Sequence, residues 1–299
     1  MIPTTHTRLG VLAAIVTEVL YGCSFAFTKN VTGTIDPFSL LGWRFVTALA
    51  VLLVLMGLRV IRVRLTRATV APLLVLAVFQ PVCYYICETY GVMHTTASES
   101  GLIMSAIPVA ILITSALILH RRPTRWQVIG IAVTLVGVAA TVIAGGFAAR
   151  FSPFGYLMLL AAIVSFSLFA AFADRFAGAA SDIEKTFVMV TSGAVWFGTI
   201  AVVRHAADHT LGVLLRLPVA RPDFALAVAY LALGSTIGAF FLQNLAIGAI
   251  GSTRFSTFIG ITTLTTLLTG AIFLGERLGW AQLLGGVVIL AGVYVANRR

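Results

Sequence analysis

The stretch ERLGWAQLLGGVVILAG at residues 276–292 has a counterpart, RRPTRWQVIGIAVTLVG, at residues 121–137. Aligning the two stretches pairs an arginine, a glutamine and two glycines, namely Arg122 with Arg277, Gln127 with Gln282, Gly130 with Gly285 and Gly137 with Gly292. Glycines seven residues apart lie on one face of a helix and allow a second helix to pack closely. Self-similarity at a fixed offset indicates that one structural unit occurs twice. The sequence therefore predicts two related halves, residues 1–148 and 149–299.

The composition of the chain excludes a water-soluble protein. Hydrophobic residues make up 60% of the chain and charged residues 10%, with a mean hydropathy of +1.04. Soluble domains are about 45–50% apolar and about 25% charged, so this chain has too little polar surface to cover itself in water. The net charge of +10 lies in short clusters between apolar runs. Such clusters are typical of the cytoplasmic loops of membrane proteins, and they indicate no nucleic-acid partner.

Apolar runs long enough to span a membrane recur along the whole chain. A hydrocarbon core about 30 Å thick needs about 20 residues of helix. Runs of this kind fall at residues 9–28, 37–57, 70–90, 97–119, 126–146, 153–173, 185–203, 224–246, 252–274 and 280–296. The sequence therefore predicts an all-α, polytopic membrane protein with ten transmembrane helices, five in each half. The first run lacks a small-residue cleavage site, so we expect a retained helix rather than a signal peptide.

The number of spans in each half determines how the halves are oriented. A second copy that follows five spans starts on the other side of the membrane, so the two halves are expected to be inverted. Lysine and arginine are more frequent at the termini and in the even-numbered connections than in the odd-numbered ones. The positive-inside rule then predicts a multi-pass protein of a bacterial-type inner membrane, with both termini in the cytoplasm. Inverted repeats are common in alternating-access transporters, which bind substrate near mid-membrane between the halves.

Several motifs resemble those of one transporter family. The sequence FLGER at residues 273–277, with the glutamine and glycines that follow it, resembles the end of an EamA domain of the drug/metabolite transporter (DMT) superfamily. The sequence YGCSF at residues 21–25 is similar to the first helix of that family. Asp36-Pro37, together with Arg44, is similar to its second helix. The resemblance extends over both halves of the chain.

Within this superfamily, the chain most resembles the YddG-type exporters of aromatic and other amino acids. The resemblance implies ten helices, cytoplasmic termini and a central cavity framed by helices from both halves. One position departs from the repeated pattern, because Arg121 stands where the second half has Glu276. A role for the glutamate at the end of the helix therefore does not transfer to the first half.

Glu18 is the clearest candidate for a functional side chain. It lies roughly 14 Å into the first run at 1.5 Å per residue, which places it near mid-membrane. Ionisable side chains at the middle of a span cost roughly 2.5–3.5 kcal/mol on insertion scales. Two interpretations stay open. Glu18 either contacts substrate or a proton, or it is a protonated carboxyl bonded to a neighbouring helix.

The third run contains a second group of candidates. Gln80 and Pro81 lie near its middle, and Tyr84 and Tyr85 follow them. A proline at this position frees a backbone carbonyl and can kink the helix. Polar and aromatic groups beside such a kink suit the recognition of a zwitterion and its ring. The alternative is a kinked packing helix with tyrosines at the membrane interface.

Charged residues near the ends of the runs have more than one interpretation. Glu88 and Glu99 flank the turn between the third and fourth runs, where an exposed outer rim is weighed against an outer gate. Gln243 occupies the repeat position of Glu88. Arg44 and Arg254 lie early in their spans, within reach of an interface, and structural pairing is preferred to capture of a substrate carboxylate.

Small and polar side chains recur at helical spacing in the fourth and ninth runs, including Ser105 in one and Ser256 in the other. Close helix packing is the default explanation, and lining of a hydrated cavity is the alternative. The complete set of candidate substrate-binding residues is Glu18, Tyr21, Gln80, Tyr84, Glu88, Glu99, Ser105, Gln243 and Ser256.

The sequence favours a transporter over an enzyme. It contains no P-loop, nucleotide-binding glycine fingerprint or hydrolase motif, so neither catalysis nor a cofactor is expected. His205, Asp208 and His209 stand in a predicted loop without further ligands, and no metal is expected there. The leading hypothesis is a secondary transporter that exports amino acids, aromatic and others, by alternating access; its cargo is inferred from the resemblance. The alternatives are an exporter of drugs, nucleobases or other small metabolites, and a membrane scaffold or receptor that transports nothing.

Overall fold

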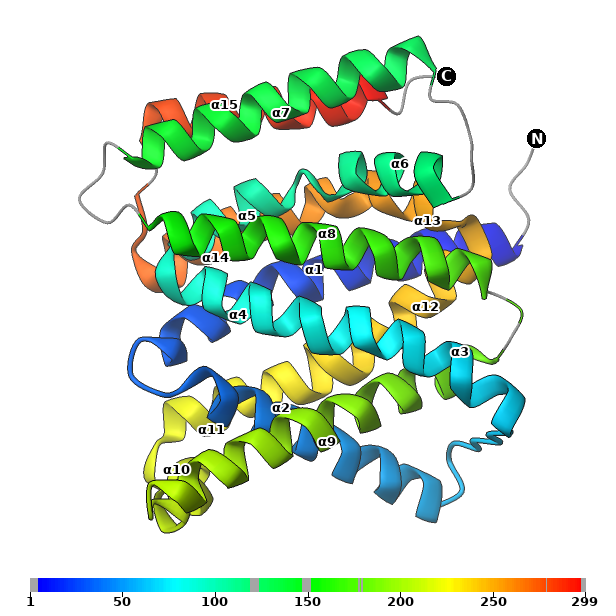
Figure 1. The fold of residues 1–299 in the computed structure, drawn as a ribbon, viewed down its shortest axis with the longest axis vertical. Coiled ribbons are helices and arrows are strands. Elements are labelled where there is room, and N and C mark those ends of the chain that lie inside the picture. Colours follow the sequence, from blue (N-terminus) through cyan, green and yellow to red (C-terminus); the bar gives the residue numbers. More distant parts are fainter. Residues whose placement is uncertain are drawn as a thin grey trace.

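Helices make up all the regular secondary structure that the computed structural model describes (Figure 1). The described residues are 5–118, 124–146, 152–176, 178, 180–277 and 279–296. Eight helical segments among them are long and apolar enough to cross a membrane. The predicted all-helical membrane class is therefore confirmed. The two other predicted spans correspond to helices α7 (Arg125–Gly146) and α15 (Trp280–Ala296), which lie side by side at one edge of the molecule (Figure 1).

The remaining elements of the first half are α1 (Thr5–Thr32), α2 (Pro37–Gly57), α3 (Arg67–Ala77), the π-helical segment η1 (Val78–Cys83), α4 (Tyr84–His94), α5 (Ala97–Met104) and α6 (Ile107–Ile118). Those of the second half are α8 (Pro153–Arg175), α9 (Asp182–Ala207), α10 (Leu211–Ala220), α11 (Pro222–Tyr230), the π-helical segment η2 (Leu231–Gly238), α12 (Ala239–Ile250), α13 (Ser252–Phe255), the 3-10 segment η3 (Ser256–Phe258) and α14 (Ile259–Leu274).

Polar residues define where several helices begin and end. Asp36, directly before α2, accepts a hydrogen bond from the backbone N–H of Ser39 (3.1 Å). Thr96 and Glu99 form a capping box at the start of α5. These side chains satisfy N–H groups that the first turn of a helix leaves without partners. At the C-terminal end of a helix, α14 is followed by Gly275, whose φ of 63° lies in the left-handed region that favours glycine.

Two of the long helices are interrupted inside the bundle. Between α3 and α4, Gln80 has the non-helical angles φ −139° and ψ 118°, and Pro81 has no N–H to donate. The carbonyl oxygen of Phe79 accepts a hydrogen bond from Ser165 Oγ of α8 (2.8 Å). The predicted kink at Gln80-Pro81 is therefore confirmed. The second interruption is η2, which joins α11 to α12 and was not predicted.

The segment between α9 and α11 is helical, whereas the sequence analysis predicted a loop. α10 is apolar but has only 10 residues, about half of what a span needs. In Figure 1 it is seen almost end-on, across the direction of the long helices. His205 also lies outside any loop, in the last turn of α9, where it contacts the hydroxyls of Ser39 (2.9 Å) and Thr210 (2.7 Å).

The first helices of the two halves, α1 and α8, run in opposite directions. Near the end of α1, Lys29 donates hydrogen bonds to the carbonyls of Val92 and Met93 at the end of α4. Near the start of α8, Gly155 packs so tightly on the same end of α4 that an added Cβ would lie 2.9 Å from the Cβ of His94. α8 therefore begins at the end of the molecule where α1 finishes. This is the relation that inverted repeats require.

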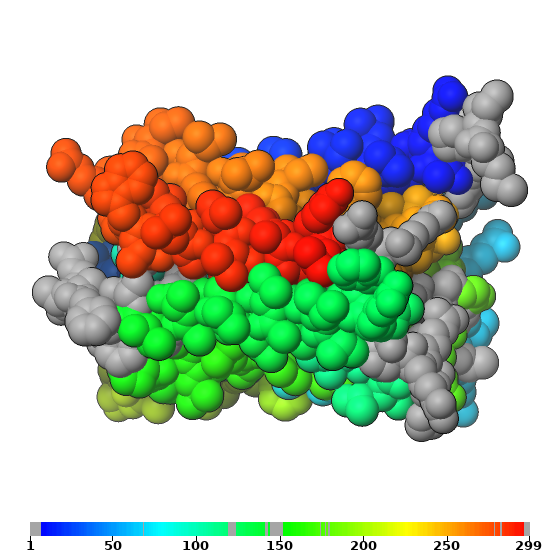
Figure 2. Space-filling model, turned by 90° about the horizontal axis from the view of Figure 1, so that it is seen from above, coloured from blue at the N-terminus to red at the C-terminus, as the bar shows by residue number. Residues whose placement is uncertain are grey.

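Equivalent helices also pair across the two halves. α2 packs on α9, α7 packs on α15, and the third helical segment of each half, α4 or α12, packs on the first helix of the other. Figure 2 shows α15 (red) lying along α7 (green). A Cβ on Gly137 would lie 2.7 Å from the backbone nitrogen of Ile289, and one on Gly292 would lie 2.5 Å from that of Thr134. The close packing predicted for these glycines is confirmed.

The outer surface of the bundle is rich in large apolar side chains. Val219 is 88% exposed, Trp280 is 83% exposed and Phe273 is 75% exposed. So many exposed large apolar side chains are unfavourable in water and suit contact with lipid. The charged and amide side chains in the middle of the bundle contrast with this surface, because they point inward.

Candidate functional site

A chain of hydrogen bonds crosses the middle of the bundle and joins both halves. The hydroxyl of Tyr21 on α1 donates to Gln243 Oε1 on α12 (2.8 Å). Gln243 Nε2 in turn donates to Gln80 Oε1 at the break before α4 (3.0 Å). Gln80 and Gln243 are fully buried. The break in the third span therefore positions an amide against a partner from the other half, and three predicted site residues lie together.

Glu18 lies one turn before Tyr21 on α1 and is only 3% exposed. The hydroxyl of Thr262 on α14 is within hydrogen-bonding distance of both the carboxyl group of Glu18 and its backbone carbonyl. A bond from a neighbouring helix was one of the two interpretations of Glu18, and the structure contains it. The other interpretation, contact with substrate or a proton, is compatible with the same geometry because a carboxyl group has several acceptor positions.

A small cavity adjoins Glu18 at the centre of the molecule. Its volume is about 20 Å³, and its lining residues are Glu18, Tyr21, Phe25, Tyr84, Met104, Ile107, Phe166, Ile259 and Thr262. A cavity needs roughly 10–15 Å³ to hold one water molecule. The centre is therefore closed in this conformation, with one carboxyl group and several aromatic rings facing a space far smaller than an amino acid.

Arg44 of α2 is buried deep in the bundle, with 1% of its surface exposed. Its Nε donates to the hydroxyl of Thr236 (2.7 Å). Its Nη2 donates to the hydroxyls of Tyr85 (2.9 Å) and Ser235 (3.0 Å), and the guanidinium carbon lies 4.2 Å from the centre of the Tyr85 ring. The η2 segment supplies Ser235 and Thr236. Arg44 is thus paired, but with hydroxyls and an aromatic ring, and no ion pair within the described residues includes it.

Glu88 lies one turn beyond Tyr84 and Tyr85 on α4 and is 1% exposed. Its carboxyl accepts a hydrogen bond from the Thr89 hydroxyl (3.3 Å) and interacts electrostatically with Arg44. The interpretation of Glu88 as part of an exposed rim is therefore wrong. The side chain turns into the bundle, where its neighbours are the tyrosines of the same helix.

Glu99 lies apart from this centre, in a pocket at the end of the molecule where α1 and α14 finish. The pocket has a volume of about 660 Å³ and is lined by Lys29, Asn30, Met93, His94, Thr95, Thr96, Glu99, Ser152, Leu274 and Glu276. Glu99 is 9% exposed, so it does not stand on an exposed rim either. One of its carboxyl oxygens accepts the backbone N–H of Thr96 (3.1 Å), so its evident role here is to cap α5.

Glu276 of the FLGER motif caps the same helix from the other half. Its two carboxyl oxygens accept the backbone N–H groups of Ala97 and Ser98, each at 2.8 Å. A carboxylate at a helix N-terminus satisfies otherwise unpaired N–H groups and complements the positive end of the helix dipole. The motif is visible in the sequence, whereas this contact between the halves is not. Its counterpart Arg121 lies outside the described residues.

Ser105 and Ser256 do not join the central group. Ser105 Oγ donates to the carbonyl of Leu102, and Ser256 Oγ donates to that of Thr253. Both side chains are buried, and each hydroxyl donates to a carbonyl three residues earlier in the chain. Neither lines the central cavity. The packing interpretation of the polar stripe fits both serines in this conformation.

The walls of the central cavity contain residues that sequence analysis did not single out. Phe166, Met104 and Ile259 close it from three different helices. Apolar side chains are common in every span, so nothing in the sequence marks these three. Thr262 did carry a signal, because it belongs to the polar stripe of the ninth run.

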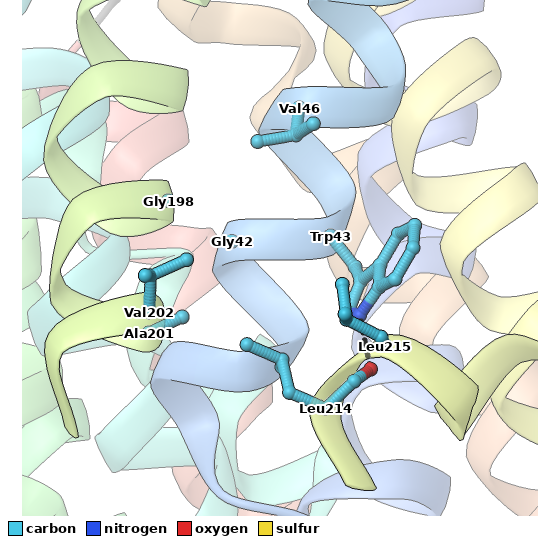
Figure 3. Close-up of a pocket in the computed structure, with 8 residues that line it drawn as sticks. All are labelled: Gly42, Trp43, Val46, Gly198, Ala201, Val202, Leu214 and Leu215. Carbon is cyan, nitrogen blue, oxygen red and sulfur yellow. Dashed lines mark hydrogen bonds between the residues drawn. The ribbon is translucent and has the colours of Figure 1, made fainter. Parts of the chain in front are cut away.

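A further pocket opens on the outside of the bundle (Figure 3). It has a volume of about 140 Å³ and is lined by Gly42, Trp43, Val46, Gly198, Ala201, Val202, Leu214 and Leu215. The indole N–H of Trp43 donates to the carbonyl of Leu214 (3.0 Å), which fixes α10 against α2. Val202 is 49% exposed and Leu215 is 64% exposed. The pocket offers no free charged or amide group, so it does not suit a zwitterion.

Apolar helices that enclose charged and amide side chains between two related halves define a polytopic membrane transporter. The chain belongs to the EamA-like transporter family, whose model matches residues 8–143 and again residues 153–298. The two successive matches confirm that the chain consists of two repeat halves. The resemblance to EamA domains noted in the sequence is thereby confirmed.

Known relatives extend over most of the chain. The uncharacterized transporter YcxC of Bacillus subtilis (strain 168) is 31% identical, with 96% of this chain and 92% of YcxC aligned. A protein of Streptantibioticus cattleyicolor described as "Probable terminal-alkyne amino-acid exporter" is 26% identical, over 72% of this chain and 69% of that protein. A "Probable amino-acid metabolite efflux pump" of Salmonella typhimurium is 24% identical, over 67% of each chain.

A solved crystal structure shares the fold. It superposes with a TM-score of 0.64 at 22% sequence identity and covers 98% of this chain and 96% of its own. At that identity the similarity establishes the architecture alone.

Proposed function

We propose that this protein is a secondary transporter that exports amino acids, aromatic and others, by alternating access. The observation that carries the proposal is the hydrogen-bonded chain from the half-buried Tyr21 through the buried Gln243 to the buried Gln80, with the buried Glu18 one turn from Tyr21. Polar and ionisable groups are expensive inside a membrane and are characteristic of substrate and ion pathways. Two relatives with amino-acid export in their descriptions support the choice of cargo.

The proposed architecture has ten spans in two inverted five-helix halves, residues 1–148 and 149–299, of the bacterial inner membrane. Opposite directions of α1 and α8, and the pairing of equivalent helices, support it. With both termini in the cytoplasm, the pocket around Glu99 and Glu276 opens to the outside. An exported substrate then moves from the closed centre toward this pocket.

Within the proposed site, the groups around the central cavity divide by chemistry. Glu18 is suited to an ammonium group or a proton, because it is the carboxyl group that faces the cavity. Tyr21, Tyr84, Phe25 and Phe166 supply ring faces and edges for an apolar or aromatic side chain. Entry of a substrate requires the halves to separate around this point, since the present volume is about 20 Å³.

The decisive experiment is transport by the purified protein in liposomes. Vesicles loaded with labelled phenylalanine should lose the label faster than protein-free vesicles, and excess unlabelled phenylalanine should slow the loss. The same vesicles loaded with a labelled nucleobase test the other metabolite class. Flux of the nucleobase without flux of any amino acid would contradict the proposed cargo. Flux of neither solute would favour a scaffold or receptor.

A further inference from the structure

Arg44 is a buried cation that lacks an anionic partner in the described part of the chain. It lies 1% exposed on α2, and its three hydrogen bonds all go to the neutral hydroxyls of Thr236, Tyr85 and Ser235. No described carboxylate oxygen lies within 4.0 Å of the guanidinium, and Nη1 makes no hydrogen bond to a described residue. Instead of reaching for the membrane interface, the side chain extends across the bundle to the η2 segment of the other half.

The second acidic group in the vicinity does not neutralise Arg44 by direct contact. Glu88 interacts electrostatically with Arg44 but forms no ion pair with it. Within the described residues, the bond from Thr89 is the one hydrogen bond that its carboxyl group accepts. A charge at this longer range offsets part of the cost of burying the guanidinium and leaves its donors available.

Arg44 and Glu18 border the same group of tyrosines. Glu18 lines the central cavity together with Tyr21 and Tyr84. The ring of Tyr84 contacts the ring of Tyr85 (5.0 Å between centroids). The guanidinium of Arg44 lies over the Tyr85 ring and donates a hydrogen bond to its hydroxyl. A carboxyl group and a guanidinium therefore stand close to one aromatic cluster. This is the pattern of charges that an amino-acid zwitterion complements, with its ammonium group toward one and its carboxylate toward the other.

The centre also holds a donor without an acceptor. Gln80 is fully buried, and its Nε2 has no hydrogen-bond partner among the described residues. Its Oε1 is occupied by Gln243, which in turn holds Tyr21. A carboxylate has four acceptor positions and binds guanidinium groups through two parallel hydrogen bonds. Gln80 Nε2 and Arg44 Nη1 are thus buried donors without an acceptor among the described residues, and a carboxylate is a suitable acceptor for such donors.

We propose that Arg44 binds the carboxylate of the transported amino acid when the centre opens. This inference rests on the proposed function and adds to it the group that recognises the acid end of the substrate. Closed, the guanidinium is held by three hydroxyls; loaded, it exchanges some of these neutral acceptors for an anionic one. The hydroxyls on η2 keep it oriented between the two states.

The test compares two ligands that differ at the carboxylate alone. Phenylalanine and phenylalaninamide share the ring and the amino group, and at mildly acidic pH both amino groups are protonated, whereas only phenylalanine carries a negative charge. Each is used to displace labelled phenylalanine from the full-length protein in detergent. For the wild type we expect phenylalanine to bind about ten to one hundred times more tightly than the amide, as for a hydrogen-bonded charge pair. In Arg44→Gln, the ratio should fall to about one.

The ratio separates recognition from a structural role. If Arg44 only supported the fold, Arg44→Gln would weaken both ligands equally and leave the ratio as in the wild type, which would overturn the inference. Should Arg44→Gln fail to give a monodisperse protein, Arg44→Lys decides. It keeps the charge but not the planar, two-pronged donor geometry, so the ratio should fall at least threefold, and an unchanged ratio counts against the proposal.

Two further measurements complete the test. The first distinguishes an amino acid from other carboxylates, and the second separates failure of this inference from failure of the proposed function. Displacement by 3-phenylpropionate, which lacks the ammonium group, distinguishes an amino acid from organic acids in general; for an amino-acid site it should compete at least tenfold less well than phenylalanine. Wild-type flux of phenylalanine in liposomes is measured in parallel. Absence of flux overturns the proposed function and the inference with it, whereas flux without any preference for phenylalanine over its amide overturns the inference alone.

Discussion

At the scale of single residues, Glu18 depends on one hydroxyl. Among the described residues, the Thr262 hydroxyl is the one hydrogen-bond partner of the Glu18 carboxyl group. The same hydroxyl is also within hydrogen-bonding distance of the backbone carbonyl of Glu18. Glu18→Gln keeps the size and the acceptor oxygen but removes the ability to carry charge. We expect phenylalanine export in liposomes to fall about tenfold or more, in line with the loss of one charged hydrogen bond.

A matched change at the surface controls for this variant. Glu184 caps α9 through Ser181 and lies away from the central cavity. Glu184→Gln should transport phenylalanine at close to the wild-type rate. Wild-type rates for Glu18→Gln across the pH range would remove Glu18 from the site.

Gln243 has a structural role that can be measured separately from transport. It accepts from the Tyr21 hydroxyl and donates to Gln80, so Gln243→Leu removes the partners of a half-buried hydroxyl and of a buried amide oxygen. Each such orphan costs about 1–3 kcal/mol, and we expect a clear fall in thermal stability in detergent. Thr257→Val, which alters an exposed hydroxyl, should remain within about 0.5 kcal/mol of the wild type. Equal stability of the two variants would contradict the proposed role.

At the scale of helices, the start of α5 is held from two sides. Thr96 and Glu99 cap it within the first half, and Glu276 adds two backbone contacts from the second. Removing such caps costs about 0.5–2 kcal/mol each. Glu276→Ala should therefore accelerate hydrogen exchange of the amides at the start of α5, whereas Arg277→Ala, at an exposed position next to it, should leave exchange unchanged. Identical exchange in both variants would show that Glu276 is dispensable for α5.

Most helices are predictable from the sequence because their length and hydropathy are local properties. The run at residues 37–57 coincides with α2, and the break at Gln80-Pro81 follows from the chemistry of proline. The π-helical segment η2 and the short helix α10 were missed. The first contacts α2 of the other half through Arg44, a contact that no local pattern marks, and the second has only 10 residues, too few for a span.

The central site was predictable only in part, for a related reason. The cost of burying a carboxyl or an amide in lipid marks Glu18 and Gln80 in the sequence itself. Which side chains meet depends on contacts between the halves, such as those that join Arg44 to η2. The apolar residues that line the cavity cannot be recognised in the sequence, because apolar side chains are equally common in the core and on the lipid-facing surface.

At the scale of the whole molecule, the inverted architecture makes a prediction about sidedness. α9 has 26 residues and is about 39 Å long at 1.5 Å per residue, enough to cross the membrane. Asp208 caps its end, and near its start Glu184 accepts a hydrogen bond from the backbone N–H of Arg64. We therefore expect Asp208 and Arg64 on opposite faces of the membrane. The positive-inside rule, applied to the sequence, predicts that Arg64 faces the cytoplasm.

This sidedness can be read from cysteine labelling in intact cells. In a background in which Cys23, Cys83 and Cys87 are replaced by alanine, Asp208→Cys should react with a membrane-impermeant maleimide. Arg64→Cys should react only after the cells are permeabilised. Labelling of both positions from outside would be incompatible with a membrane-spanning α9. The reverse pattern would turn the molecule over, so that the pocket around Glu99 and Glu276 would open to the cytoplasm and the proposed export path would have to run the other way.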